Sequence, residues 1–335
     1  MIQKIADYVN EHREELALPS GTRNSLSFFK VGGNPWAKGR INFLVFNKKQ
    51  AEPILFVKSV REKVMNESLR QEYDIIKKLA SCPELTPFLP LPVHMVSLGG
   101  YDVMLQKACH GERMLISLSK IPILHFQKQT ISDNFSSSLE FITTFNKFIQ
   151  NELSPSEFKR EIINPFLSFY RDYGCSDQNK IALTLLCERA CHIMGDVPTS
   201  TPIHGDYSAT NIFIDSQNQI KIIDWETATE TSLPFLDLFY FMSKYIHNLK
   251  ILPRDRWQRV KTAYFGNSWL SDLIRKTVYG YCEQTHLSAE LGRVLFPLHF
   301  LNKAKIKYSM RGREQTQPWI ELFEYSMGNL DDLCF

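Results

Sequence analysis

The chain has 335 residues, of which 44% are hydrophobic, and a formal net charge of +3. This composition supports a sizeable folded core and excludes a disordered chain, and the mild charge argues against a nucleic-acid-binding groove. Seven scattered cysteines without a CxxC pair favour reduced thiols over a disulfide framework or a zinc site. Segment 1–20 follows a helical pattern without the apolar stretch of a signal peptide, and the longest apolar runs are strand-sized. We therefore expect a cytoplasmic protein without a membrane span.

The first third of the sequence is typical of short strands around a single helix. Strands are predicted where β-branched and aromatic residues are bounded by Gly, Pro and Asn. These segments are 25–31, 40–46, 53–60, 93–98 and 101–108. A helix is predicted at 61–80, because one stripe recurs there at three- and four-residue steps. The stripe comprises Met65, Leu69, Glu72, Ile76 and Leu79.

Helical patterns dominate the remainder of the sequence. Helices are predicted at 138–153, 156–170, 179–195 and several segments beyond 234. The stretch 132–140 is predicted as a loop running into a helix, and 212–223 as a hairpin. Together these elements predict an α+β protein with a β-rich N-terminal lobe at 1–107, which holds one key helix. A larger, mostly helical lobe is predicted at 108–335.

Polar residues gather around the predicted hairpin. The stretch "IHGDYSATN" (203–211) precedes it, and "IKIIDWE" (220–226) supplies its second strand and the residues that follow. Pro198 and Pro202 are predicted to end the preceding helix, so the His-Gly-Asp triplet is expected on a loop between that helix and the hairpin. Gly205 would let this loop turn sharply.

This arrangement brings three side chains that carry oxygen ligands toward the same edge of the predicted hairpin. Asp206 follows the glycine turn, Asn211 directly precedes the first hairpin strand, and Asp224 ends the second. Carboxylate and amide oxygens are hard ligands that suit Mg²⁺ better than zinc. The spacing H-G-D-x4-N, then a hairpin, then I-D-W-E therefore predicts a site that handles charged oxygen and metal.

These motifs resemble the signature of the aminoglycoside phosphotransferase and choline kinase-like enzymes, which are relatives of the protein kinases. The resemblance covers roughly residues 25–245 by motif order. It implies a bilobal protein kinase-like fold and an enzyme that moves the γ-phosphoryl group of ATP to a hydroxyl of a small molecule, with Mg²⁺ as cofactor. The acceptor would be a sugar, an amino alcohol or an aminoglycoside-like compound.

The resemblance also assigns roles to individual residues. It implies that Asp206 orients or deprotonates the acceptor hydroxyl, and that Asn211 and Asp224 hold Mg²⁺ on the phosphates. His204 would brace the catalytic loop. Asp237, in "PFLDLFYF", matches an acidic residue that supports this loop from the following helix.

Phosphoryl transfer also needs a positioned cation on the nucleotide side. Lys58 lies on the predicted third strand, where its apolar neighbours would fix its stem. Glu72 lies in the apolar stripe of the following helix, where a carboxylate is costly unless it is paired. We therefore expect a Lys58–Glu72 ion pair, which the resemblance identifies as the phosphate clamp. Glu62 and Glu67 are the alternative acids of this helix.

The segment 101–114 resembles the strand and linker that connect the two lobes in this family. The resemblance implies that backbone groups from Gln106 to Ala108 meet the adenine edge, and that Gly111 opens the chain into the helical lobe. A plain strand end is the alternative interpretation.

The loop 32–39 departs from the compact glycine turn of the family, because Pro and Trp stand between its glycines. Gly32, Gly33 and Asn34 are candidates for binding the nucleotide phosphates through backbone amides and the Asn34 side chain. A simple long hairpin loop is the alternative.

The acceptor pocket leaves two alternatives open. A cationic acceptor would need an acidic or aromatic pocket, to which Glu226 and Asp237 are candidate contributors. The basic stretch 302–313 favours an anionic or sugar-phosphate acceptor instead. The sequence does not decide between them.

Two other functions also stay open. A catalytically weak pseudokinase, acting as a binding or regulatory module, would fit the irregular glycine loop, although the intact Lys58, Glu72 and Asp206 argue against it. A protein kinase-like enzyme is disfavoured, because HGD replaces HRD, DWE replaces DFG and no APE motif follows.

Overall fold

The computed structural model of the protein describes residues 2–18, 26–31, 40–48, 50–91, 93–115, 124–148, 151–195, 198–249 and 255–335. The chain divides into two compact units. Unit 1 comprises Met1–Ile116 and Thr210–Ala228, and unit 2 comprises Ser117–Ala209 and Thr229–Phe335. Within the described residues, no helix combines the length and the apolar character that crossing a membrane requires.

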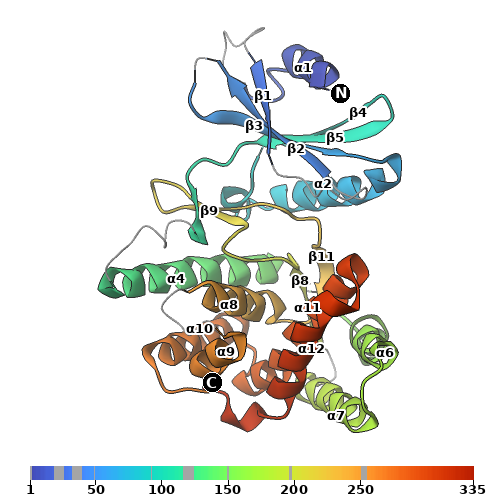
Figure 1. The fold of residues 1–335 in the computed structure, drawn as a ribbon, viewed down its shortest axis with the longest axis vertical. Helices are drawn as coiled ribbons and strands as arrows, with labels where there is room; N and C mark the ends of the chain where they lie inside the picture. Colours follow the sequence, from blue (N-terminus) through green and yellow to red (C-terminus); the bar gives the residue numbers. More distant parts are fainter. Residues whose placement is uncertain are drawn as a thin grey trace. The chain divides into compact units, whose positions relative to one another are not determined.

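Unit 1 is built on a five-stranded antiparallel sheet (Figure 1). Its strands are β1 (Leu26–Lys30), β2 (Arg40–Asn47), β3 (Pro53–Val60), β4 (Val93–Leu98) and β5 (Tyr101–Lys107). They follow the order β1-β2-β3-β5-β4, so β5 lies between β3 and β4. All five predicted strands are confirmed.

The two faces of this sheet carry different side chains, because neighbouring residues of a strand alternate between the faces. One face packs against α1 (Ile2–Glu11). The resulting core includes Ile5, Val9, Val45, Val57 and Val103. Lys58 lies on the opposite face and contacts α2 (Asn66–Ala80). The buried stripe of α2 is Leu69, Glu72, Ile76 and Leu79, as predicted.

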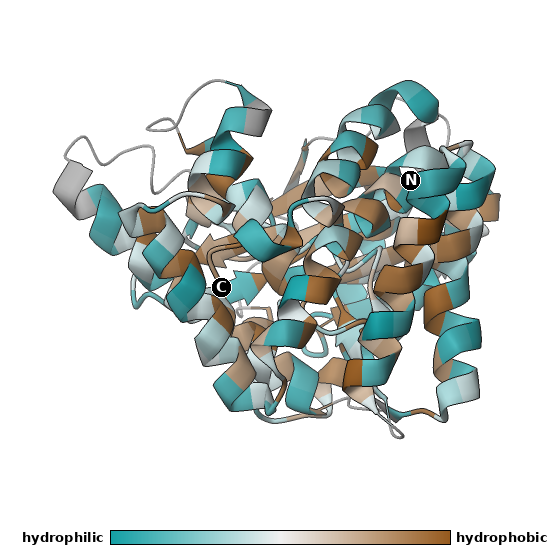
Figure 2. Ribbon diagram, turned by 90° about the horizontal axis from the view of Figure 1, so that it is seen from below, coloured by the Kyte–Doolittle hydropathy of each residue, from teal (hydrophilic) through white to brown (hydrophobic). Residues whose placement is uncertain are grey.

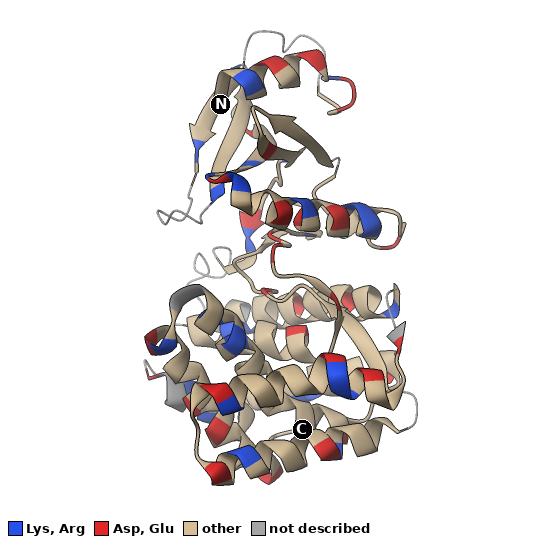
Figure 3. Cartoon of the chain, turned by 90° about the vertical axis from the view of Figure 1, so that its right-hand side faces the viewer, with Lys and Arg blue, Asp and Glu red and all other residues tan. Residues whose placement is uncertain are grey.

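The predicted helix begins earlier than α2, and before α2 the structure has only a 3-10 turn, Lys63–Met65. Met65, the first residue of the predicted stripe, is half-buried in this turn. Acidic and basic residues are interspersed along α2 (Figure 3). This mixture is expected of an amphipathic helix that is buried along one stripe only.

The predicted hairpin is also confirmed, and it belongs to unit 1. Strands β9 (Ile212–Ile214) and β10 (Ile220–Ile222) pair antiparallel, and β6 (Glu112–Arg113) adds to the other edge of β9. The Asp215 carboxylate closes the turn by accepting from the backbone N–H groups of Gln217 (2.8 Å) and Gln219 (2.9 Å). Asp at this position favours such a turn because its side chain bonds the backbone two residues on.

Unit 2 is mostly helical. Its helices are α4 (Leu124–Phe148), α5 (Pro155–Phe158), α6 (Asn164–Tyr173), α7 (Asp177–Met194), α8 (Leu236–Asn248), α9 (Arg256–Tyr264), α10 (Trp269–Thr285), α11 (Ala289–Arg311) and α12 (Arg313–Met327). Hydrophobic and hydrophilic residues share the same helices, as packing around a core requires (Figure 2). Side-chain caps fix several helix starts, because the first backbone N–H groups otherwise lack partners. These caps are Ser154, Ser176, Asp255, Ser268 and Ser288.

The prediction of a loop at 132–140 was wrong, because these residues lie inside α4. Ser and Asn favour loops when their side chains compete for the backbone. Here two of these side chains form hydrogen bonds within the helix or the core instead. Ser136 Oγ donates to the carbonyl of Ser132 (3.0 Å), and buried Asn134 donates to the Tyr245 hydroxyl (2.7 Å).

The predicted helix at 156–170 is interrupted by a π-helical segment, Lys159–Ile163. Pro165 follows it in the first turn of α6. Proline has no N–H to donate and its ring crowds the carbonyl four residues before it, so the backbone widens ahead of it.

The chain reaches the His-Gly-Asp triplet through a strand, which the sequence analysis did not predict. Strand β8 (Thr199–Ile203) pairs with β7 (Asn151–Glu152) and β11 (Thr229–Ser232) in a small sheet of unit 2. Pro202 lies within β8 instead of ending a helix. It is tolerated because the register of β8 and β11 shifts between Thr229 and Ser232, opposite the proline.

Gly111 offers a test of the join between β5 and the hairpin. Its φ is +98°, and a Cβ added there would lie 2.1 Å from the Ile214 carbonyl oxygen. Because both backbone strain and overlap oppose a side chain, we expect Gly111→Ala to destabilise the protein by about 3 kcal/mol. Gly174→Ala is the control, since Gly174 has φ +87° and ψ +47°, and the nearest atom to the added Cβ is a side-chain nitrogen of Arg313 at 3.8 Å. It should cost about 1 kcal/mol in urea unfolding; equal costs would contradict the steric argument.

Candidate active site

The predicted ion pair between Lys58 and Glu72 is present in unit 1. Lys58 Nζ lies 2.6 Å from Glu72 Oε1, and both residues are buried. Lys58 Nζ also lies 3.0 Å from Oδ1 of Asp224. Burial alone would lower the pKa of Lys58, but the two carboxylates outweigh it and hold this pKa above its ordinary value. Glu62 and Glu67 are exposed, so the buried partner of Lys58 is Glu72.

A second cation, Arg40 at the start of β2, also binds Glu72. Its guanidinium reaches Ser68 Oγ (3.2 Å) and Glu226 Oε2 (3.5 Å). Burial lowers the pKa of Arg40, but Glu72 and Glu226 outweigh it and raise this pKa. The backbone N–H of Trp225 donates to Glu72 Oε1 (3.2 Å). Glu72 thereby joins β2, β3, α2 and the residues after β10.

Asp224 and Asn211 lie at the same end of the hairpin. The backbone N–H of Ile223 donates to the carbonyl of Asn211 (3.0 Å), just beyond the paired residues of β9 and β10. Asp224 has φ +70°, a left-handed conformation that costs a non-glycine residue about 1–2 kcal/mol. Such strain is kept where the surrounding structure fixes it, often at functional sites.

The donor set of Asn211 and Asp224 fits Mg²⁺. One amide oxygen and one carboxylate are hard ligands, and Mg²⁺ usually takes only one or two protein oxygens beside phosphates and water. Among the described residues, no group of three or more His, Cys, Asp or Glu is placed to enclose a metal. The pair therefore suits a phosphate-bridging ion and not an all-protein metal cage.

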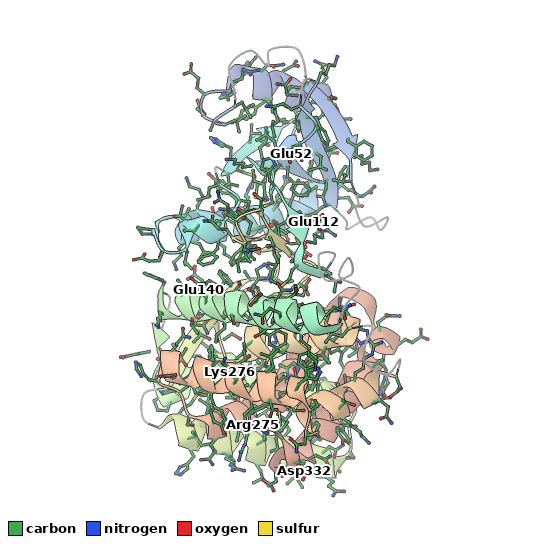
Figure 4. The ribbon with its side chains drawn as sticks, turned by 90° about the vertical axis from the view of Figure 1, so that its left-hand side faces the viewer. Glu52, Glu112, Glu140, Arg275, Lys276 and Asp332 are labelled. Atoms are coloured by element: carbon green, nitrogen blue, oxygen red, sulfur yellow. The ribbon has the colours of Figure 1, made fainter. Side chains whose placement is uncertain are left out.

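An apolar cavity of about 370 Å³ lies in unit 1 beside these charges. Its walls include Val31, Leu44, Phe56, Gln106, Ala108, Phe213 and Ile223, with Glu52 among the polar lining residues (labelled in Figure 4). Phe56 is two residues before Lys58 on the same face of β3, and Ile223 directly precedes Asp224. The cavity volume and its apolar walls are typical of a ligand pocket. Gln106 and Ala108 line it, and their role at the adenine edge stays a prediction.

Unit 2 holds the His-Gly-Asp triplet on a tightly bonded loop. Asp237, in the first turn of α8, accepts from the backbone N–H groups of His204 (2.6 Å) and Gly205 (3.0 Å). Gly205 has φ +77°, the left-handed turn predicted for it. The backbone N–H of Asp206 donates to Nδ1 of His204 (3.3 Å), and His204 is fully buried. These contacts fix the backbone that leads into Asp206.

The Asp206 carboxylate is contacted by two residues that the site prediction did not include. Lys303 Nζ of α11 lies 2.5 Å from Asp206 Oδ1, and the Tyr240 hydroxyl of α8 donates to the same oxygen (2.7 Å). Burial raises the pKa of Asp206, but Lys303 outweighs it and holds this pKa below its ordinary value. Burial and the Asp206 carboxylate raise the pKa of Tyr240 well above its ordinary value, so its hydroxyl stays a donor.

The remaining predicted residues fall into two groups. Gly32, Gly33 and Asn34 lie outside the described residues. Glu226 belongs to the charged cluster of unit 1, where it contacts Arg40, and its role as a substrate residue stays a prediction. Of the residues that were missed, Arg40 carried no signal in the sequence, whereas Lys303 was visible only as one of several cations in 302–313.

Comparison with known proteins identifies the fold. No protein-family model matches the sequence, and no curated protein is detectably similar to it. Choline kinase LicA from Streptococcus pneumoniae aligns over 98% of this chain and 99% of that chain, with a TM-score of 0.55 and 13% identity. A GDP and kanamycin complex of an aminoglycoside phosphotransferase aligns over 90% and 93%, with a TM-score of 0.53 and 14% identity.

A putative fructosamine-3-kinase from Thermobifida fusca aligns over 96% of this chain and 99% of that chain, with a TM-score of 0.51 and 13% identity. All three names describe small-molecule kinases. The chain therefore has the bilobal protein kinase-like α+β fold of these enzymes, which confirms the fold predicted from the sequence.

Glu72 can be tested by removing its charge. Glu72→Gln would leave Lys58 and Arg40 buried without their shared carboxylate, so we expect a loss of about 3 kcal/mol in the free energy of unfolding. Urea unfolding with two-state analysis measures this loss. Glu67→Gln, at an exposed position of the same helix, should change stability by less than about 0.5 kcal/mol. A Glu72→Gln protein as stable as this control would contradict a structural role for the cluster.

Asp237 predicts a particular dependence of stability on pH. Burial raises its pKa to about 7, against the opposing effect of the two backbone N–H donors. Its folded-state pKa thus exceeds the unfolded value of about 4, so the folded protein binds the extra proton. Its contribution to stability is present below about pH 4 and is lost as pH rises through about 7. Asp237→Asn should remove a slope of up to about 1.4 kcal/mol per pH unit in this window.

Urea unfolding at a series of pH values checks this slope, with exposed Asp331→Asn as the matched control. A wild-type curve that runs parallel to that of Asp237→Asn would show that Asp237 does not bind this proton.

Proposed function

We propose that the protein is an ATP- and Mg²⁺-dependent O-phosphotransferase that moves the γ-phosphoryl group of ATP to a hydroxyl of a small molecule. The observation that carries this proposal is the buried Lys58 ammonium, held by Glu72 and Asp224 beside an apolar cavity. A fixed cation, a carboxylate that suits Mg²⁺ and a pocket for a planar base are the parts that nucleotide binding needs. The likeness in fold to small-molecule kinases supports the proposal.

On the nucleotide side, the residues of unit 1 would bind and orient ATP. The cavity would take the adenine, with Phe56 and Ile223 against its faces and the backbone near Ala108 at its edge. Lys58 would contact the phosphates, because Glu72 keeps its ammonium charged and in place. Asn211 and Asp224 would hold Mg²⁺, which supplies positive charge to the phosphate oxygens.

On the acceptor side, Asp206 would accept a hydrogen bond from the reacting hydroxyl. The hydroxyl oxygen forms a bond to the γ-phosphorus as the bond from that phosphorus to the bridging oxygen of ADP breaks, and the hydroxyl proton passes to Asp206. Lys303 holds the pKa of this carboxylate below its ordinary value, so the carboxylate stays ionised and can accept the hydrogen bond that orients the hydroxyl.

The proposal is tested by calorimetric titration with ATP and by ATP turnover against a panel of hydroxyl compounds. We expect ATP to bind more tightly with Mg²⁺ than without it, and Asp224→Asn to abolish this difference. Asp206→Asn should still bind ATP but should lower turnover by about 10² to 10⁴-fold, because it cannot accept the proton.

Asp331→Asn, at an exposed position of unit 2, is the matched control and should behave as the wild type. A protein that binds no ATP would overturn the proposal. ATP binding without any turnover would show that the protein is a nucleotide-binding module and not an enzyme. Normal turnover by Asp206→Asn would show that Asp206 does not accept the proton.

A further inference from the structure

Lys303 is not a surface lysine. It lies on α11 with 3% of its surface exposed, and Asp206 Oδ1 is 2.5 Å from its Nζ. The same ammonium lies 4.1 Å from the centroid of the Tyr240 ring, a cation–π contact that fixes it from a second side. Lysine is almost never this buried unless it is paired. Among the cations in 302–313, Lys303 therefore contacts the Asp206 carboxylate.

Three other groups lie near Asp206. Tyr240 on α8 contributes a neutral hydroxyl, and His204 on the same loop contacts a backbone N–H. Asp237, also on α8, is a second carboxylate, which is 4% exposed and accepts from two backbone N–H groups. The Lys303 ammonium offsets the charge of Asp206 itself, where the acceptor hydroxyl must bind.

This compensation limits what the acceptor can carry. A hydroxyl that donates to Asp206 Oδ1 lies within about 6 Å of Lys303 Nζ, given ordinary hydrogen-bond lengths. A positive group on a neighbouring atom of the acceptor would then meet a buried like charge at short range, where water screens it poorly. A negative group there would be attracted instead.

We propose that the acceptor is an anionic hydroxyl compound, such as a sugar or polyol that bears a carboxylate or phosphate. Lys303, beside Asp206, is the residue that determines this specificity. The inference rests on the proposed function and names its substrate class. It distinguishes this chain from the choline kinase and the kanamycin complex that share its fold, because choline and kanamycin are cations.

The test uses hydroxyl compounds that share a skeleton and differ in charge. One set is glucuronate, glucose and glucosamine, and the other is glycerol 3-phosphate, glycerol and 3-amino-1,2-propanediol. Binding to the protein saturated with ADP and Mg²⁺ is measured by calorimetry, and phosphorylation is measured by ATP consumption. We expect an anionic member to bind at least about tenfold more tightly than its cationic counterpart.

Variants at Lys303 assign the preference to this residue. Lys303→Met should reduce or reverse the ratio of anion to cation affinity, and Lys303→Arg should restore most of it because the charge returns. Lys305→Met is the matched control: Lys305 is on the same helix, packs over Phe166 and has no contact with Asp206, so the ratio should not change.

Thermal unfolding of each variant shows whether it is folded, and Lys303→Arg keeps the test valid if Lys303→Met is not. A wild type that binds ADP but prefers the cationic members, binds no anionic member, or keeps its preference in Lys303→Met overturns this inference alone. A wild type that neither binds nor consumes ATP overturns the proposed function and this inference with it.

Discussion

A single buried carboxylate, Glu72, determines the chemistry available to unit 1. It accepts from Lys58, from Arg40 and from the backbone N–H of Trp225. The desolvation cost of such a group is offset only while all its partners are in place. Because these partners come from β2, β3 and the segment after β10, the carboxylate fixes three separate parts of the chain against α2. The position of the Lys58 side chain and the course of the backbone next to Asp224 both depend on this one carboxylate.

The charged cluster carries more negative than positive side chains. Lys58 and Arg40 face Glu72, Asp224 and Glu226, which leaves one negative charge in excess among the five. Burial and the nearby Asp224 raise the pKa of Glu226, so proximity of the two carboxylates is already unfavourable. Under the proposed function, a divalent cation would relieve this repulsion while the phosphates engage Lys58. The cluster is then a preorganised receptor that requires both parts of a nucleotide–metal complex.

The parts of the structure that could be predicted from the sequence are those that local residue patterns determine. The strands, α2 and the hairpin follow two- and 3.6-residue periodicities, and Glu72 within an apolar stripe was enough to predict its pairing with Lys58. Arg40 could not be predicted, because nothing in the sequence shows where the first residue of a strand directs its side chain. The start of α4 and the strand around Pro202 were missed because tertiary packing reverses the local preferences of Ser, Asn and Pro.

Under the proposed function, the loop of unit 2 that holds Asp206 could serve acceptors of opposite charge. The loop around Asp206 is fixed by backbone contacts to Asp237, and these contacts do not depend on what the acceptor is. The charge beside Asp206 is set instead by Lys303, from a helix about a hundred residues farther along the chain. A fold can therefore keep the loop that positions the carboxylate while a distant helix changes the local charge. This separation explains why the loop motif predicted a kinase-like site, whereas the acceptor could be approached only through the three-dimensional contacts of α11.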